Sequence, residues 1–187
     1  MYEIYDCVPK NSEGSMQPEN LFGPITQIGY LTDDIETTAA FWTQTSGIGP
    51  WTRMSGVSMA TTMDGEPSTI NIDVAITYKD DVQIELINPL CDSPSPYLAN
   101  KRAGLWGLHH TQFTTKDMNA SMELAKSAGL ELACTINQGG GVYTYLRGRG
   151  VWFEMIQASE ELEMFFGMIK SACDNWDGRE LIRDIAL

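Results

Sequence analysis

The chain repeats one order of elements, and this repetition limits the folds open to it more than any other feature. PITQIGYLTDD (24–34) and GLHHTQFTTKD (107–117) each lead from a predicted strand to an Asp that can cap a following helix. Three more strands are expected after each helix. At an offset of 83 residues, Gln27 aligns with His110 and Asp34 with Asp117. Weak identity within a shared order of elements indicates an old internal duplication.

Each half is therefore predicted to be a βαβββ module. The expected fold class is therefore α+β. We expect a single domain over 1–187, which consists of an irregular lead-in (1–23), a first module (24–90), a Pro- and Ser-containing linker (91–106), a second module (107–158), and a C-terminal helix and tail (159–187).

Charge and cysteine usage narrow the classes of partner and compartment. The formal net charge is −13, from 25 acidic and 12 basic residues, and the basic residues are scattered. Nucleic acids and anionic membranes need clustered Lys and Arg, so neither is an expected partner. No run approaches the roughly 20 apolar residues of a membrane span. The four cysteines form no CxxC pair, and Asp6 and Lys10 interrupt any signal peptide. We expect a soluble, cytoplasmic protein with free thiols.

Four polar side chains occupy matching places in the two halves. Gln27 and His110 lie in the first strands, and Glu85 and Glu154 lie in the last strands. If each half curves, its first and last strands can bring these side chains together, since strand residues alternate between faces. Buried carboxylates are costly unless they are paired or bind a metal. Nitrogen and oxygen donors suit Zn, Ni, Co, Mn or Fe. The pattern alone leaves open that each residue lies on a solvated face.

Four segments carry a resemblance to a known family. QIGYLTDDIETTAAFWTQTSGIGPW resembles the first module of the vicinal oxygen chelate superfamily, which includes glyoxalase I and methylmalonyl-CoA epimerase. GLHHTQFTTKDM resembles the opening of its second module, and IELINPL and WFEMI resemble its two ligand-bearing strands. The match covers roughly residues 24–158. It implies a glyoxalase/bleomycin resistance-like fold, in which the two βαβββ modules form one curved mixed sheet that closes a cleft around one divalent metal ion.

The resemblance also assigns roles to residues. It implies that Gln27, Glu85, His110 and Glu154 bind the ion, and that His109, on the other strand face, has a core or surface role. The Gln–Glu–His–Glu order is similar to that of zinc-type glyoxalase I. The implied function is a metal-dependent isomerase, epimerase or lyase acting through an enediolate intermediate. Glu154 would be the general base, and Glu85 would be a ligand or second base.

The expected substrate is a carbonyl compound of hydrophobic or aromatic character. The scarcity of basic residues argues against glutathione or CoA conjugates. The residues expected to contact the substrate are Trp51, Asn88, Phe113, Tyr143 and Trp152. Each of them has a packing or turn role as its alternative.

Two alternative functions remain open from the sequence. One is a non-haem Fe(II) ring-cleaving dioxygenase, although Gln27 stands where those relatives have a first His ligand. The other is a metal-free protein that sequesters a small molecule, although such relatives usually lack the carboxylate pair Glu85 and Glu154. A homodimer is expected, because superfamily modules often pair across chains. The last helix also has an apolar stripe that can pack on the fold or on a partner chain: Leu162, Phe165, Phe166 and Ile169.

Overall fold

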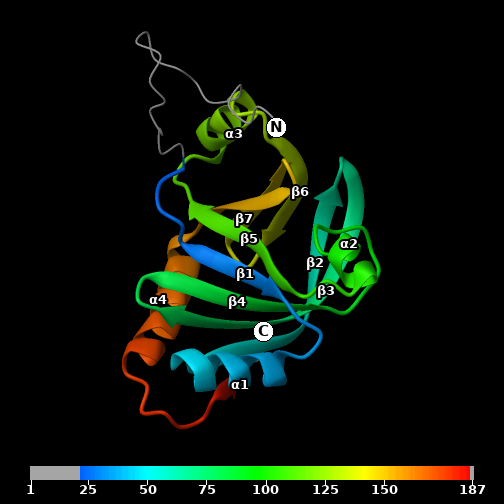
Figure 1. Ribbon diagram of the computed structural model, residues 1–187. Coiled ribbons are helices and arrows are strands. Elements are labelled where there is room, and N and C mark those ends of the chain that lie inside the picture. Colours follow the sequence, from blue (N-terminus) through cyan, green and yellow to red (C-terminus); the bar gives the residue numbers. More distant parts are fainter. Residues whose placement is uncertain (1–21, 186–187) are drawn as a thin grey trace, which may run out of the picture.

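The computed structural model describes residues 22–185, so the predicted lead-in lies almost entirely outside the described residues (Figure 1). The first module consists of β1 (Gln27–Leu31), α1 (Ile35–Ser46), β2 (Trp51–Met63), β3 (Glu66–Lys79) and β4 (Val82–Pro89). A short helix, α2 (Leu98–Ala103), follows. The second module consists of β5 (Gly107–Thr114), α3 (Met118–Ser127), β6 (Glu131–Gln138), β7 (Gly141–Gly148) and β8 (Val151–Ala158). The chain then forms α4 (Glu160–Asp174) and β9 (Ile182–Asp184).

The helices begin where the sequence predicts. Asp34 is the N-cap of α1 and accepts a hydrogen bond from the Thr37 N–H at 3.0 Å. Asp117 caps α3 in the same way, at 3.0 Å from the Ala120 N–H. Such caps satisfy backbone donors that have no partner within the helix. The two modules therefore start their helices by the same local device, as expected from a duplicated unit.

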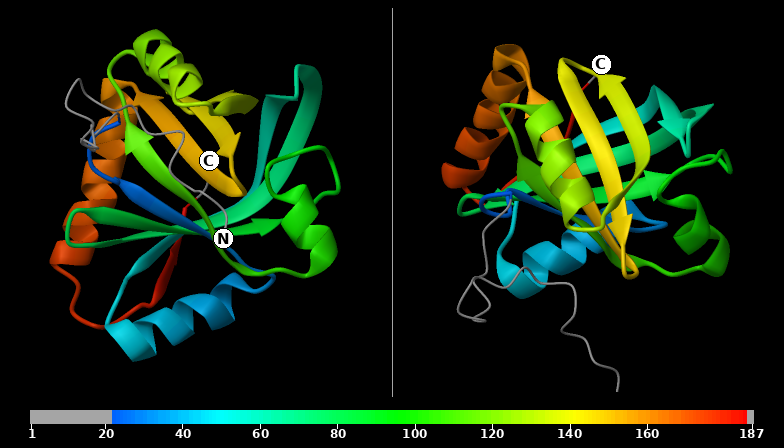
Figure 2. Two further views of the ribbon diagram at one scale, coloured as in Figure 1. Left: turned by 45° about the horizontal axis from the view of Figure 1, so that its top comes forward. Right: turned by 90° about the horizontal axis from the view of Figure 1, so that it is seen from above.

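All nine strands of the described chain form one sheet, in the order β3-β4-β1-β5-β8-β7-β6-β2-β9. Within each module the first and last strands pair in parallel, as β1 with β4 and β5 with β8. The modules join through the antiparallel β1–β5 pair and through the end of β2, which pairs with β6. Since β2 also pairs with β3, the sheet closes around an axis (Figures 1 and 2). The predicted α+β fold with one curved mixed sheet is confirmed.

Apolar side chains pack on both sides of this sheet. The main cluster lies inside it, where Met54, Ile72 and Tyr145 meet residues of α4 such as Ile169. Smaller clusters lie under α1 and under α3 on the outer face. In Figure 1, α4 runs along one side of the sheet, beside β3 and β4, and it packs mainly on β3. The curved sheet and α4 thus surround a common interior.

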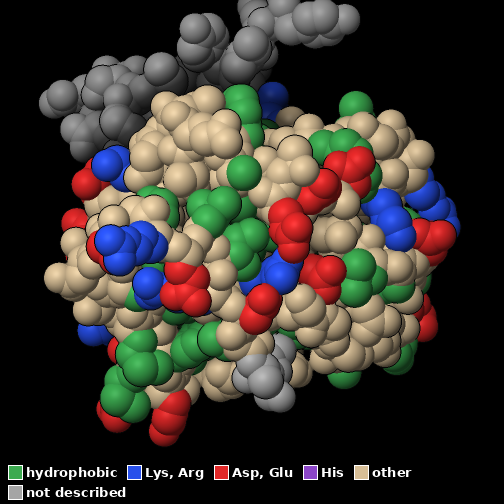
Figure 3. Space-filling view, turned by 90° about the horizontal axis from the view of Figure 1, so that it is seen from below, with side chains coloured by type: hydrophobic (Ala, Val, Ile, Leu, Met, Phe, Trp, Pro, Cys, Tyr) green, Lys and Arg blue, Asp and Glu red, His purple; other side chains and the backbone are tan. Residues whose placement is uncertain are grey.

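The tail after α4 returns to the first module, which the sequence did not predict. β9 pairs in parallel with the start of β2, and the Trp51 N–H donates to the Leu181 carbonyl oxygen at 2.8 Å. Arg53 lies 2.6 Å from Asp184 and 2.9 Å from Glu36 of α1. On the face seen in Figure 3, basic side chains likewise stand beside acidic ones. Among the described residues, no helix is both long enough and apolar enough to cross a membrane.

Candidate metal and acid–base site

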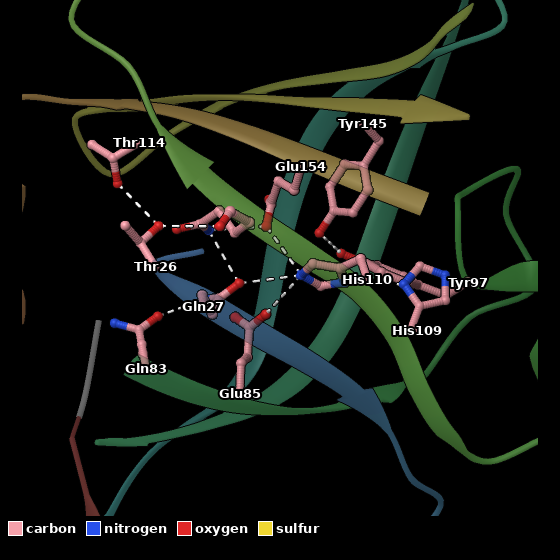
Figure 4. Close-up of polar contacts among 11 residues, drawn as sticks. Thr26, Gln27, Gln83, Glu85, Tyr97, His109, His110, Thr114, Tyr145 and Glu154 are labelled. Atoms are coloured by element: carbon pink, nitrogen blue, oxygen red, sulfur yellow. Dashed lines mark hydrogen bonds and ion pairs between the residues drawn. The ribbon is translucent and has the colours of Figure 1, made fainter. Parts of the chain in front are cut away.

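The four residues predicted as metal ligands meet inside the curved sheet (Figure 4). His110 Nε2 lies 3.1 Å from Gln27 Oε1, 3.1 Å from Glu154 Oε2 and 3.8 Å from Glu85 Oε2. The four residues come from β1, β4, β5 and β8, which are neighbours in the sheet. The side chain of His110 is fully buried, while those of Glu154 and Glu85 are 4% and 15% exposed. Strands far apart in sequence thus place an amide, an imidazole and two carboxylates around one point.

The register of β1 against β5 makes room for the imidazole. Gly29 pairs with His110, and the ring lies directly over the glycine. A Cβ atom at position 29 would be 2.0 Å from His110 Cε1, closer than real Cβ contacts allow. Any side chain there would therefore displace the ring.

Further amides, which the sequence analysis missed, orient the predicted ligands. Gln112 Nε2 donates to Gln27 Oε1 at 3.1 Å and to Glu154 Oε2 at 2.9 Å. Gln27 Nε2 donates to Gln83 Oε1, so the Gln27 carbonyl oxygen is turned toward His110. Gln112 could have been found from its spacing, because it follows His110 by two residues and strand residues i and i+2 share a face.

Burial and mutual repulsion shape the protonation of the acids. Burial, followed by the nearby charge of Glu154, raises the pKa of Glu85 to about 8. Burial alone would lower the pKa of His110, but the hydrogen bond to Glu154 and the charges of Glu154 and Glu85 raise it overall. Without a cation, Glu85 and His110 thus tend to keep their protons. A divalent ion would reverse this preference, because its charge stabilises the carboxylates and the imidazole lone pair.

The donor set fits a borderline divalent cation. Two ligand atoms about 2.1 Å from one ion lie roughly 3.0–3.4 Å apart, depending on coordination number. The two 3.1 Å separations from His110 Nε2 agree with this range. Residues 22–185 contain no group of three His, Cys, Asp or Glu side chains already spaced for a metal. One donor here is an amide, and the Glu85 carboxylate lies farther from His110, at 3.8 Å.

The cluster forms the polar floor of a cavity of about 320 Å³. Helix α4 contributes Leu162, Phe165 and Phe166 to its wall, and Glu161 also borders it. The described residues that line the cavity include no Lys or Arg. Most of the remaining wall is aliphatic and comes from β2, β3 and β6, through Met54, Val57, Met59, Ile72, Val74, Ile76 and Ile136.

Of the five predicted substrate contacts, only Tyr143 lies on the cavity wall. Trp51 is fully buried in the cluster under α1, where its Nε1–H donates to Thr43 Oγ1 at 3.3 Å. Asn88 pairs with Asp73 near the end of β4. Neither belongs to the described cavity lining, because Trp51 packs under α1 and Asn88 lies on the face of β4 opposite to Glu85.

Phe113 and Trp152 also lie outside the described cavity lining. Phe113 follows Gln112 and so points to the opposite face, where its ring packs 5.5 Å from that of Phe22. Trp152 stacks on His109, with ring centroids 5.9 Å apart and an interplanar angle of 20°. Bulk and apolar character suggested a cleft wall, but strand alternation turns only Phe113 away from the cavity. Trp152 shares the strand face of Glu154, where it packs against His109 and does not line the cavity.

The comparison with protein families agrees with this geometry. The family described as the glyoxalase/bleomycin resistance protein/dioxygenase superfamily matches residues 26–145. The chain belongs to this superfamily. The superfamily is the one that the sequence motifs resemble, so that prediction is confirmed. No curated protein sequence matches the chain.

Solved structures show the same fold at low identity. Methylmalonyl-CoA epimerase from Mycobacterium tuberculosis has a TM-score of 0.57 and 14% identity, over 80% of this chain and 97% of that one. The Streptomyces coelicolor epimerase in complex with 2-nitronate-propionyl-CoA has a TM-score of 0.54 and 18% identity, over 74% and 99%. A hypothetical protein from Bacillus halodurans has a TM-score of 0.55 and 17% identity, over 73% and 95%. At these identities the likeness concerns the fold.

Proposed function

We propose that this superfamily member is a divalent-metal-dependent isomerase, epimerase or lyase that moves a proton next to a carbonyl group. One observation carries the proposal: two carboxylates, an imidazole and an amide converge at the floor of an otherwise apolar cavity. The ligands are Gln27, Glu85, His110 and Glu154. A Zn, Ni, Co, Mn or Fe ion bound there would polarise the substrate carbonyl and stabilise the negative charge that develops on its oxygen.

Glu154 is the proposed general base. Its Oε2 is held by Gln112 Nε2 at 2.9 Å, and its residue borders the cavity, where a substrate C–H bond can approach it. Glu85 borders the same cavity from β4 and is the proposed ligand or second proton carrier. Two acids on different strands can serve two faces of one carbon, as epimerisation requires. Positioned proton transfer of this kind contributes roughly 10²–10⁴-fold to a rate.

The cavity favours a small, uncharged, hydrophobic or aromatic carbonyl compound. Its wall is aliphatic and aromatic, and its volume suits a compact molecule. Some of the similar epimerase structures carry 2-nitronate-propionyl-CoA, and another carries methylmalonyl-CoA. The phosphates of such a ligand would find no cationic partner among the described cavity residues, and they would be repelled by Glu161. The surface outside the cavity would have to bind them.

The test measures proton exchange rather than a named reaction. The metal-loaded protein is incubated in D₂O with hydrophobic α-hydroxy ketones, 2-oxo aldehydes and aryl ketones, and deuterium entry next to the carbonyl is followed by NMR. We expect exchange that requires the metal and that Glu154→Gln slows by about 10²–10⁴-fold. Glu161→Gln is the matched control, since it changes a cavity-border carboxylate outside the cluster. Equal exchange by Glu154→Gln with full metal content would remove Glu154 as the base.

The apolar cavity also favours one second candidate, a metal-free protein that binds a small hydrophobic molecule. Such a protein would bind its ligand equally well after chelation and after Glu154→Gln. A dioxygenase would instead consume O₂ only with Fe(II). Exchange supported by Zn, Ni or Co in the absence of O₂ excludes both.

A further inference from the structure

The chain has two histidines, and they are adjacent, yet only His110 faces the ligand cluster. His109 Nδ1 lies 3.0 Å from His110 Nδ1 (Figure 4). His109 Nε2 lies 3.1 Å from the Pro96 carbonyl oxygen. We propose that His109 is a positioning residue: it keeps a proton on His110 Nδ1 and so directs the Nε2 lone pair of neutral His110 toward the cation. The inference rests on the proposed metal-dependent function.

The direction of each hydrogen bond follows from what the atoms can do. A carbonyl oxygen only accepts, so His109 Nε2 must carry the proton in its contact with Pro96. His109 is buried at 7% exposure, and its two nitrogens face only that carbonyl and another imidazole. A buried imidazolium without an acidic partner is costly, so His109 is neutral and its Nδ1 is an acceptor. The proton between the two rings therefore belongs to His110 Nδ1.

Fixing this proton decides what the other ring nitrogen can do. With Nδ1 protonated, neutral His110 presents an unprotonated Nε2 to Gln27 Oε1 and Glu154 Oε2, where the ion would lie. The opposite tautomer would place a proton there and block coordination. Metal-binding histidines usually fix their tautomer through a carboxylate, carbonyl or water. Here His109 takes this part, because it contacts both His110 and the carbonyl oxygen of Pro96, in the segment before α2.

Packing holds His109 in the orientation that this role needs. Trp152 stacks on one side of its ring, and the Tyr97 ring centroid lies 5.3 Å away. Tyr97 is itself held by a hydrogen bond between its hydroxyl and that of Tyr145 at 2.8 Å. The ring therefore cannot easily turn to exchange its two nitrogens.

Nitrogen-15 NMR of the tag-free, metal-free protein tests the proton positions directly. With two histidines in the chain, the spectrum contains two imidazole systems, and protonated and unprotonated ring nitrogens are well separated. We expect His109 protonated only at Nε2 and His110 protonated at Nδ1, whether His110 is neutral or charged. An unprotonated His110 Nδ1, or a protonated His109 Nδ1, would overturn the inference.

Three variants then separate positioning from packing. In His109→Asn the side-chain oxygen can occupy the Nδ1 position, so the acceptor is kept. In His109→Gln the amide reaches the Nε2 position and can donate to Pro96, but the acceptor is lost. His109→Phe loses both while filling the space. We expect His109→Gln and His109→Phe to weaken zinc affinity by about 10–100-fold and His109→Asn by less than about tenfold.

Zinc affinity is measured by competition with a chromogenic chelator, and circular dichroism checks the fold. Equal affinities for the Asn, Gln and Phe variants would contradict the positioning role. If the wild-type protein binds no divalent ion, the proposed function fails. The NMR spectrum of the metal-free protein still tests whether His109 keeps the proton on His110 Nδ1. If the variants do not fold, the wild-type NMR spectrum alone decides it.

Discussion

His110 occupies the space that a side chain at position 29 would fill. The site therefore requires glycine at position 29, because the imidazole lies over the β1 backbone where it contacts Gln27 and Glu154. Single residues likewise set the orientation of each donor, as Gln112 does for Gln27 and Glu154. At this scale the site is a set of close contacts with little freedom to adjust.

Gly29→Ala is predicted to weaken metal binding by about tenfold or more, because the new methyl group must displace the His110 ring. Zinc competition titration measures the effect. The matched control is Gly167→Ala on α4, where an added Cβ meets no atom within 4 Å. An unchanged zinc affinity in Gly29→Ala would show that His110 does not contribute to binding.

Cysteine reactivity provides a second prediction at the residue scale. Burial, with the charge of Glu154, raises the pKa of Cys134 to about 12. Partial burial raises the pKa of Cys91, but hydrogen bonds from the Asn71 N–H and from Ser93 bring it below its usual value. At pH 8 the Cys134 thiol therefore stays almost entirely protonated, and the thiolate is the form that reacts.

Iodoacetamide at pH 8 should therefore modify Cys91 far faster than Cys134, as measured by peptide mass spectrometry. The Cys91 rate should fall as the pH is lowered through the thiol pKa, because the thiolate fraction falls. Denaturant should remove the difference. Equal native rates would contradict the buried position of Cys134.

At the scale of elements, α4 changes the character of the cavity. Its residues Leu162, Phe165 and Phe166 form part of the cavity wall, on the side where α4 packs against β3. The apolar stripe that suggested a dimer interface therefore faces inward, and the exposed side of α4 carries Met164 and Met168 instead. The homodimer remains a prediction without support from that stripe.

Phe165→Ala is predicted to reduce the free energy of unfolding by about 1–3 kcal/mol, less than for a fully buried ring because Phe165 is half-buried. It should also enlarge the cavity and broaden the range of carbonyl compounds that exchange deuterium. Met164→Ala is the control on the same helix: its side chain is 63% exposed, so a change within about 0.5 kcal/mol is expected. Urea unfolding measures both. A null effect of Phe165→Ala would show that α4 does not cover the cavity.

At the scale of the whole molecule, the candidate site joins the two modules. Gln27 and Glu85 come from the first module and His110 and Glu154 from the second, across the β1–β5 pair. A ligand held by both modules binds only the folded chain. Binding of the proposed metal ion would therefore stabilise the whole fold.

Removal of divalent ions should lower the melting temperature. At a free zinc concentration 100-fold above Kd, binding contributes about 2.7 kcal/mol. For a domain of this size that corresponds to roughly 5–11 °C. Differential scanning calorimetry with zinc and with EDTA measures the shift. His110→Ala should abolish it, whereas Glu123→Gln, an exposed acid on α3, should retain it. A shift that persists in His110→Ala would place the zinc elsewhere.

Much of the fold was readable from the sequence because its signals are local. Alternating strands, the Asp34 and Asp117 caps, and the repeated element order all act over a few residues. They predicted the two modules and the strands that carry Gln27, Glu85, His110 and Glu154. Strand alternation also separates the faces of neighbouring residues, so the convergence of the four could be anticipated once the sheet was assumed to curve.

The tertiary structure decided everything that depends on which surfaces meet. It assigned Trp51, Phe113 and Trp152 to positions away from the cavity, because apolar bulk is equally suited to a core, and it placed Asn88 on the strand face opposite to Glu85. It placed α4 along the cavity, paired β9 with β2, and set the His110 ring over Gly29. It also brought His109 into contact with His110. Such contacts join residues through packing and register across long stretches of chain, and no local pattern specifies them.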